Sequence, residues 1–361
     1  MIGWVIGFYF FMRYVKITSY FLFSIFLLSL LIDFTENIGR LSGLAAYSPL
    51  RALSLSILRS PLIIQQIFPF ISLFSAITTL ISLNLHLELV IARSIGLSTW
   101  QFLFPIFLGA FLFGLIAILI INPLAATGNR TSKEILTKWR HDSKTLPLQN
   151  SIIWFTQSTD EYPTIIGGNN KNGQRLTQAT FVIFNKNKRI RYWINADTAL
   201  LKKGYWQLRH GVRYSLGKTP ESFDQIWIPT HIKPQFIEQT TSDPLTTPFY
   251  AVPLKIKIEK SFGSYSNEFN MYLQSIIAFP AFVLAMTFIA ATVSLQFMRG
   301  SSPPKIGIII RIIAGFVLYV VSVIVKTFSN AGYIPAIIAA WFPILIAIVL
   351  AISFLIYKEN G

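Results

Sequence analysis

The side chains that could do chemistry are few, and their spacing indicates no catalytic site. The sequence has no cysteine, and neither H-E-x-x-H nor G-x-S-x-G occurs in it. Its four histidines lack the spacing of metal ligands; they are His86, His141, His210 and His231. The run Gly211–Thr219 is similar to a phosphate-binding loop, but it is one residue too long and Pro220 follows where a helix is required. We therefore predict no catalytic residue, no metal and no cofactor bound by the chain itself.

Charged residues are unevenly distributed along the chain. Only 13% of the 361 residues are charged and 53% are hydrophobic, whereas a soluble domain carries about 25% charge. The polar stretch from Asn129 to Lys260 contains 20 Lys and Arg against 10 Asp and Glu, so +10 of the net charge of +16 lies there. This pattern excludes an ordinary soluble protein and predicts a membrane protein with one large polar insert.

Six apolar runs approach the length of about 20 residues that a membrane-spanning helix needs. They cover Ile17–Ile32, Ser60–Leu87, Ser94–Asn129, Phe269–Met298, Ile306–Val325 (interrupted by Arg311) and Thr327–Tyr357. Three of them precede the polar insert and three follow it. The sequence therefore predicts an α-helical polytopic membrane protein with six transmembrane helices in a 3+3 order.

The polar insert has the composition of a β domain. Short aromatic and β-branched runs alternate with turn signals such as Asn185–Lys188 and Lys203-Gly204. The predicted strands are Ser151–Phe155, Thr164–Ile166, Thr180–Phe184, Arg189–Asn195, Ala199–Leu201, Tyr205–Leu208, Val212–Leu216 and Gln225–Ile228. Many short strands favour a sandwich, jelly roll or barrel. We expect its interior to be lined by Phe181, Ile183, Trp193 and Trp206.

These segments divide the chain into three parts: transmembrane helices at 1–128, the all-β domain at 129–262 and transmembrane helices at 263–361. With six spans, both termini lie on one side of the membrane. The basic residues of the short flanks on that side are Arg13, Lys16, Arg93, Arg299, Lys305 and Lys358, and those of the short loop opposite are Arg40, Arg51 and Arg59. This excess predicts cytoplasmic termini and a β domain outside the cytoplasm.

The connector between the second and third spans, at about 85–98, has the pattern of a short amphipathic helix that ends at Gly96. Its run Glu88–Ser98 resembles the coupling helix of the LptF/LptG family, the permeases of the lipopolysaccharide export ABC transporter. Two further runs, Arg311–Tyr319 and Gly332–Pro343, are similar to the fifth and sixth spans of that family, nearer to LptG than to LptF. The 3+3 order with a β insert resembles the family along nearly the whole chain.

The resemblance implies a permease subunit that does not itself hydrolyse ATP. It implies a heterodimer with an LptF-like paralogous permease, driven by a cytoplasmic ABC ATPase dimer that uses ATP and Mg²⁺. In such a transporter, lipopolysaccharide leaves the outer leaflet of the Gram-negative inner membrane between spans one and five. It then passes a periplasmic β-jellyroll and reaches a periplasmic bridge. A single-span LptC-like subunit lies at the gate, and no nucleic acid takes part.

The match to the coupling helix falls on Glu88, Arg93 and Gly96. The resemblance therefore implies that these residues couple ATP hydrolysis in the partner ATPase to movement of the permease. Read from the residues alone, the same charges belong to the solvated face of a loop helix.

The second implied site lies near the outer ends of spans one and five. Arg40 and Lys326 are candidate contacts for anionic headgroups, because ionisable groups at membrane depth are functional candidates. Asp33 or Glu36 could instead pair with Lys326 as a structural ion pair across this lateral gate. Family members often have a basic residue about where this chain has Asp33, and Arg40 would take its place.

Two basic residues, Arg51 and Arg59, are candidates for lining the first outer loop.

Three other functions remain open from the sequence. The chain could fill the paralogous LptF role, or be another ABC permease with an extracytoplasmic domain. It could also be an envelope scaffold whose β domain binds a partner. An intramembrane enzyme is disfavoured because the spans contain no convincing acid–base pair or metal cluster.

Overall fold

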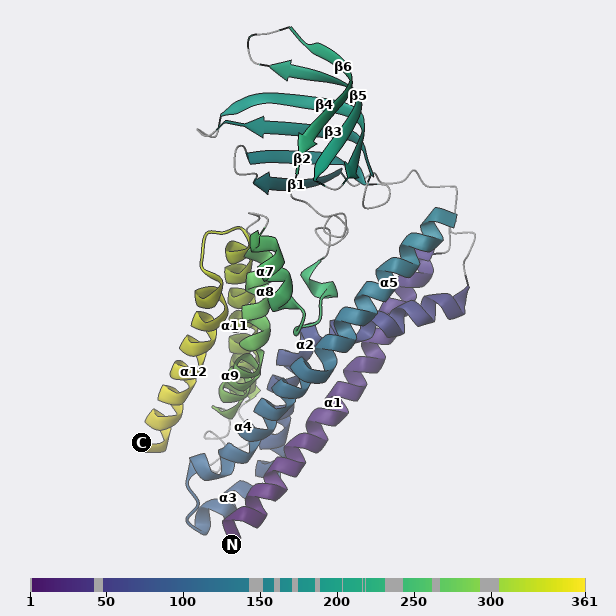
Figure 1. The fold of residues 1–361 in the computed structure, drawn as a ribbon. Coiled ribbons are helices and arrows are strands. Elements are labelled where there is room, and N and C mark those ends of the chain that lie inside the picture. The colour runs from purple at the N-terminus through teal and green to yellow at the C-terminus, as the bar shows by residue number, and fades with distance from the viewer. Residues whose placement is uncertain are drawn as a thin grey trace. The chain divides into compact units, whose positions relative to one another are not determined.

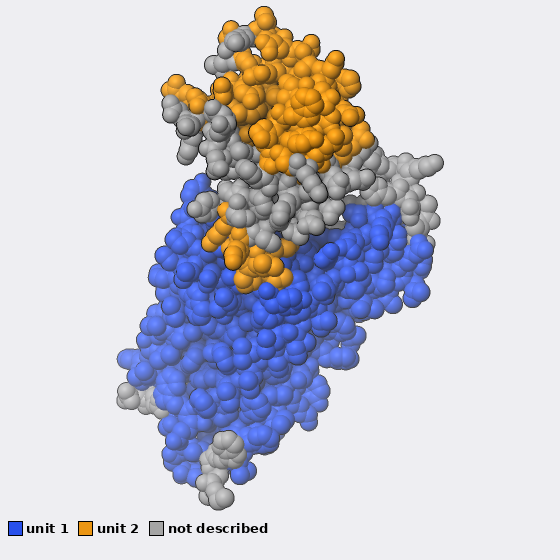
Figure 2. Space-filling view, viewed as in Figure 1, with its two compact units in different colours: residues 1–143, 245–250, 267–361 blue, residues 144–244, 251–266 orange. Residues whose placement is uncertain are grey.

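The computed structural model describes residues 2–41, 48–142, 152–158, 163–170, 175–185, 189–202, 204–215, 217, 219–230, 243–261, 267–292 and 305–360 (Figure 1). The chain divides into two compact units, coloured separately in Figure 2. The helical unit comprises Met1–Ser143, Leu245–Tyr250 and Asn267–Gly361, and the sheet unit comprises Lys144–Pro244 and Ala251–Ser266. Each unit is described by itself below.

The helical unit is built from long, apolar helices. They are α1 (Ile2–Leu41), α2 (Pro49–Leu85), α3 (Glu88–Ser94), α4 (Thr99–Ile116), α5 (Asn122–Asp142), α8 (Asn267–Ile277), α9 (Phe279–Ala291), α11 (Lys305–Asn330) and α12 (Ala336–Asn360). A π-helical turn, Ala117–Ile121, joins α4 to α5 without a break. A 3-10 turn, Pro244–Thr246, also belongs largely to this unit.

Five of the described helical segments are long and apolar enough to cross a membrane. They are Val5–Gly39, Pro49–Leu85, Thr99–Trp139, Ile306–Asn330 and Ala336–Tyr357. A sixth results if the pair α8 and α9, bent by 52° at residue 278, is counted as one span. The chain is therefore a multi-pass membrane protein by the length and composition of its helices.

The predicted border between the last two spans is wrong. Residues 327–330 belong to α11, and α12 begins only at Ala336. Lys326 does not end the helix, because a single charge on a helix face costs no backbone hydrogen bond. The chain turns instead at Gly332, whose φ of +86° favours glycine, and Pro335 precedes the new helix.

The predicted border at 128/129 is also displaced, because it falls inside α5. The polar half of this helix continues to Asp142 and packs against the end of α1 and the start of α2. Ile135, Leu136 and Trp139 contact a buried cluster formed by Leu41, Ala52 and Leu55. The spacing of those three apolar residues is typical of one helix face, so the signal was present within a stretch that is otherwise polar.

The sheet unit contains six antiparallel strands in the order of the sequence, β1-β2-β3-β4-β5-β6. The strands are β1 (Ile152–Ser158), β2 (Pro163–Asn170), β3 (Arg175–Phe184), β4 (Ile190–Lys202), β5 (Tyr205–Ser215) and β6 (Glu221–Pro229). Helix α7 (Val252–Ser261) belongs to the same unit. Among the described strands each pairs with its neighbour in sequence, so the crossovers of a jelly roll stay a prediction.

A row of irregular residues crosses the middle strands. Ladder pairing is interrupted at Gln178, Asp197 and His210, and the backbone is left-handed at Gln178 (φ 52°) and His210 (φ 47°). At such bulges the alternation of buried and exposed side chains shifts by one residue. In β4, for example, burial passes from Ala196 to Ala199 rather than to Thr198. This shift explains why the sequence pattern predicts four separate short strands where the structure has β4 and β5.

Helices α5 and α2 approach each other closely at Gly128 of α5. A Cβ atom there would lie 2.1 Å from the backbone carbonyl oxygen of Leu58 in α2. We expect Gly128→Ala to separate the two helices and to lower the free energy of unfolding by about 1–3 kcal/mol. The measurement is the midpoint of thermal unfolding in detergent. Gly39→Ala is the matched control, because a Cβ at Gly39 in α1 meets nothing within 4 Å; equal midpoints for both variants would contradict the predicted clash.

Candidate functional site

Helix α3 is a short helix held between two long ones. Its first residue, Glu88, follows Leu87, whose left-handed backbone (φ 61°) turns the chain sharply after α2. At its other end Gly96 (φ +89°) turns the chain toward α4. Seven residues are too few for a helix that is stable on its own. Leu89 and Ala92, which are buried, therefore fix α3 to the rest of the helical unit.

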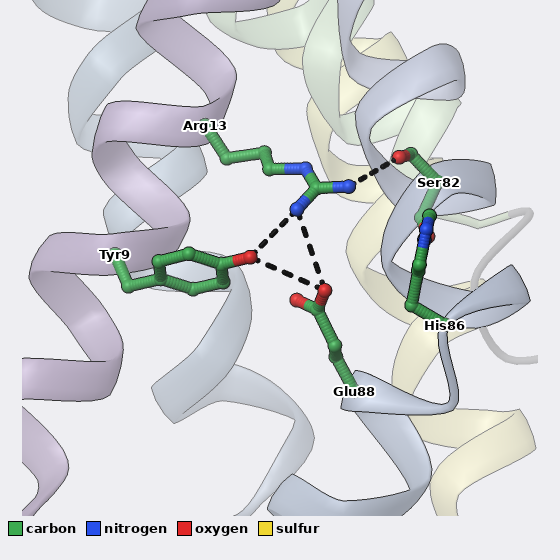
Figure 3. Close-up of polar contacts among 5 residues, drawn as sticks. All are labelled: Tyr9, Arg13, Ser82, His86 and Glu88. Atoms are coloured by element: carbon green, nitrogen blue, oxygen red, sulfur yellow. Dashed lines mark hydrogen bonds and ion pairs between the residues drawn. The ribbon is translucent and has the colours of Figure 1, made fainter.

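The carboxylate of Glu88 lies in a polar cluster between α1, α2 and α3 (Figure 3). Arg13 Nη1 lies 3.4 Å from Glu88 Oε1 and donates a hydrogen bond of 2.6 Å to the hydroxyl of Tyr9. The Tyr9 hydroxyl donates in turn to Glu88 Oε1 at 3.2 Å. Arg13 Nη2 donates to Ser82 Oγ in α2 at 2.8 Å. These four residues, called the Arg13–Glu88 cluster below, connect α1, α2 and α3 through one guanidinium.

His86 flanks this cluster without entering it. Its Nδ1 atom lies 2.7 Å from the backbone carbonyl oxygen of Ser82, to which it donates when that nitrogen is protonated. The ring therefore closes the end of α2, where the last carbonyl groups have no partner within the helix.

The other two residues predicted on the connector have different surroundings from Glu88. Arg93 is exposed and donates to Thr99 Oγ1 in α4 at 3.2 Å. Gly96 is also exposed, and its contribution is its left-handed backbone rather than a side chain. The structure thus links Arg93 to α4 and Glu88 to α1.

The connector presents apolar side chains to its surroundings. Between 45% and 65% of the surface of each of these residues is exposed: Leu85, Leu87, Val90, Ile91 and Ile95. We call this set the connector apolar face. An exposed group of large aliphatic residues beside charged ones is typical of a docking surface. The buried side of α3 thus joins the helical unit, while its free side is suited to another protein.

Asp33 of α1 is paired with Arg59 of α2, not with Lys326. Asp33 is only 3% exposed, and its Oδ1 lies 3.2 Å from Arg59 Nη1. Its Oδ2 accepts a hydrogen bond of 2.8 Å from Asn37, which also donates to Ser56. Arg59, predicted to line the first outer loop, therefore neutralises a buried carboxylate instead.

The remaining residues predicted at the lateral gate are Lys326, Glu36 and Arg40. Lys326 of α11 is half-buried and its Nζ lies 5.9 Å from the centre of the Phe282 ring of α9. Glu36 is exposed on α1. Arg40 is in the last turn of α1, and its side chain lies outside the described part of the structure. The predicted ion pair of Lys326 with Asp33 is thus not formed within this chain.

A buried chain of hydroxyl groups, missed by the sequence analysis, connects α1, α2 and α9. The hydroxyl of Tyr14, a fully buried residue, lies 3.1 Å from Ser72 Oγ, which lies 2.9 Å from Thr287 Oγ1. Thr287 donates onward to the carbonyl oxygen of Val283 in α9. A hydroxyl residue in an apolar run is the only signal that the sequence offers for such a contact.

The four residues predicted to line the β interior divide into two groups. Phe181, Ile183 and Trp206 are buried in the core of the sheet unit, where the Phe181 and Trp206 rings meet edge to face. Trp193 is on the opposite face, because it alternates with buried Ile194, and it stacks on Tyr214 at 5.2 Å. The sequence analysis identified the aromatic strand but assigned this tryptophan to the wrong face.

Comparison with known families decides what these features belong to. Residues 8–358 match the family model of the lipopolysaccharide export system permease LptF/LptG. The chain belongs to the LptF/LptG family. No curated protein matches it. Members of this family are permease components, and the apolar helices agree with a multi-pass inner-membrane protein.

Family membership gives the two polar clusters a common setting. The Arg13–Glu88 cluster and the Asp33–Arg59 pair are on the same helix of the permease, α1, about 20 residues apart, or roughly 30 Å at the rise of an α-helix. Helix α1 is therefore fastened to α2 by polar contacts near both of its ends, and at one end also to α3.

Because Asp33 is buried, the contribution of the Asp33–Arg59 pair to the stability of the fold can be tested. We expect Arg59→Gln to leave the Asp33 carboxylate buried without its cation and to lower the free energy of unfolding by about 1–3 kcal/mol. Replacing both residues (Asp33→Asn with Arg59→Gln) removes the buried charge and is expected to recover part of that loss. Both effects are measured by thermal unfolding in detergent.

The control for this prediction is Arg130→Gln in α5. Arg130 forms an ion pair of 2.9 Å with Glu134, but their side chains are 72% and 55% exposed. Its loss is expected to change stability by less than about 0.5 kcal/mol. If Arg59→Gln were no more destabilising than Arg130→Gln, the Asp33–Arg59 pair would have no structural role.

Proposed function

We propose that the chain is the LptG-like permease subunit of an ABC transporter that extracts lipopolysaccharide from the outer leaflet of the inner membrane. The observation that carries the proposal is the family match over residues 8–358, which includes the connector with its anchored helix α3. In this role the chain supplies half of the transmembrane cavity and hydrolyses no ATP.

Helix α3 is the proposed contact with a cytoplasmic ABC ATPase. Its buried residues, Leu89 and Ala92, attach it to the permease, and its free side carries the connector apolar face. Large aliphatic side chains on a small projecting helix fit a groove in a partner protein. Glu88, Arg93 and Gly96 are assigned to coupling because they fix the position of this helix relative to α1 and α4.

The substrate has many acyl chains and an anionic headgroup, and both features require coupling to ATP. Each CH₂ group removed from the bilayer costs about 0.8 kcal/mol, so extraction of several chains is too unfavourable to proceed unaided. Lys326, half-buried beside Phe282 in α9, is the proposed headgroup contact, together with Arg40. Because Arg59 neutralises Asp33, it is not assigned to the substrate.

The sheet unit is the proposed periplasmic domain, and the termini are proposed to be cytoplasmic. This orientation follows from the excess of basic residues in the short flanks at the termini. The apolar core around Phe181, Ile183 and Trp206 is the proposed path for acyl chains. The proposed partners are an LptF-like permease, an ABC ATPase dimer, a single-span LptC-like subunit and a periplasmic bridge.

Purification of the tagged chain from its own membranes in mild detergent tests this function. We expect mass spectrometry to find an ABC ATPase and a second permease of this family in the preparation. Release of lipopolysaccharide from proteoliposomes in the presence of ATP would support the transport reaction. Pairing with an LptG-like chain instead would assign the LptF role, and recovery of envelope proteins without any ATPase would favour a scaffold.

The contact through α3 has its own test. Ile91 is 55% exposed on the connector apolar face, so Ile91→Asp is expected to leave the fold intact. It should lower the amount of co-purified ATPase by about tenfold, the effect of losing roughly 1.4 kcal/mol. Thr137→Asp is the matched control, because it adds the same charge to an exposed position of α5. Equal ATPase recovery from both variants would exclude Ile91 from the interface.

A further inference from the structure

We infer that Arg13 is a positioning residue for ATP coupling: it transmits the movement of α3 to α1 through Glu88. This inference rests on the proposed function, because it concerns how the permease responds to the ATPase. In this inference the Glu88 carboxylate contacts another group of the permease, and the coupling path continues from α3 into α1.

The geometry of the Arg13–Glu88 cluster carries the inference. The Arg13 guanidinium contacts one group on each of three segments: Tyr9 of α1, Ser82 of α2 and Glu88 of α3. The Arg13 and Glu88 side chains are only 25% and 22% exposed, so water screens their interaction weakly. Because Tyr9 also donates to the same oxygen of Glu88, α3 is connected to α1 by two hydrogen-bonding groups.

The second carboxylate oxygen of Glu88 strengthens this dependence on Arg13. Glu88 Oε2 is buried and has no hydrogen-bond partner among the described residues. A carboxylate whose second oxygen is unsatisfied depends on its cation for compensation of its desolvation. Separation from Arg13 therefore costs Glu88 more free energy than it would cost an exposed glutamate. For this reason we expect movement of α3 to move α1.

The backbone on both sides of α3 explains why this helix needs the contact between Glu88 and Arg13. Leu87 and Gly96 both have left-handed backbones, and the helix between them has only seven residues. Such an element can change its angle by small rotations at its two ends. The buried side chains of Leu89 and Ala92 hold α3 against the unit but give it no fixed direction, since apolar contacts are non-directional. The charged contact between Glu88 and Arg13 supplies the direction toward α1, as the hydrogen bond from Arg93 to Thr99 does toward α4.

The test is a charge exchange in the complete transporter, reconstituted in proteoliposomes. The readout is the amount of lipopolysaccharide released per ATP hydrolysed, because a change that only reduced folding or assembly would lower both quantities together. We expect Arg13→Glu and Glu88→Arg each to lower this ratio by about tenfold, the effect of roughly 1.4 kcal/mol. The double exchange is expected to restore it to within about threefold, and Arg13→Lys to retain most of it.

Lys16→Glu is the matched control. It makes the same change of charge on α1 one turn away, at an exposed residue outside the cluster, and is expected to leave the ratio unchanged. If Arg13→Glu behaves like Lys16→Glu, the inference is overturned. The same holds if the double exchange is as defective as the worse single variant, since the pair then has no specific role.

A second measurement covers the case in which the charge variants do not assemble. The chain has no cysteine, so Arg13→Cys with Glu88→Cys introduces the only two thiols. Joining them with a short bifunctional maleimide is expected to restore the ratio that the unjoined variant has lost; no restoration would overturn the inference. A wild-type chain that binds no ATPase or releases no lipopolysaccharide would instead refute the proposed function.

Discussion

The helical unit depends on a few polar contacts between helices that are otherwise apolar on every side. In lipid, apolar helix surfaces gain little by leaving the bilayer for one another, so side-chain hydrogen bonds and close packing fix their relative positions. Tyr14, Ser72 and Thr287 make such a contact between α1, α2 and α9. Asn122, fully buried after the π-helical turn, donates to Tyr272 of α8 and accepts from the Phe249 backbone. Sliding any of these helices would leave polar groups unsatisfied in an apolar environment.

Two arginines perform this task, one before and one after the sheet unit in the sequence. Arg13 joins α1 to α2 and α3. Arg311, 6% exposed, donates to the hydroxyl and the carbonyl oxygen of Thr292, where α9 ends. It also donates to the Gly307 carbonyl oxygen of its own helix. A guanidinium suits both positions because its five donors lie in one plane and reach several acceptors at once.

The sequence predicted the apolar helices, the β insert and the connector, because each follows from a local pattern. Its errors occurred where distant contacts override that pattern. The polar half of α5 is helical because Trp139 and its neighbours pack on α1 and α2, and the strands β4 and β5 continue through bulges that interrupt the alternation. Likewise, Glu88 was predicted as a coupling residue, but its pairing with Arg13 joins positions 75 residues apart. No spacing rule predicts such a contact from one sequence.

The position of α3 is consequently set by what it is attached to and not by its own stability. A helix of seven residues has too few internal hydrogen bonds to persist alone, so it holds its shape only while Leu89, Ala92 and Glu88 keep their partners. Because α3 is so short, a force on its exposed apolar side cannot be taken up by bending within α3 itself. It must act on the groups that hold α3, and the directional ones among them are the guanidinium of Arg13 on the α1 side and the hydrogen bond of Arg93 to Thr99 on the α4 side. In the coupling that we infer, movement at the connector is delivered to α1, the helix that also carries the buried Asp33–Arg59 pair near its other end.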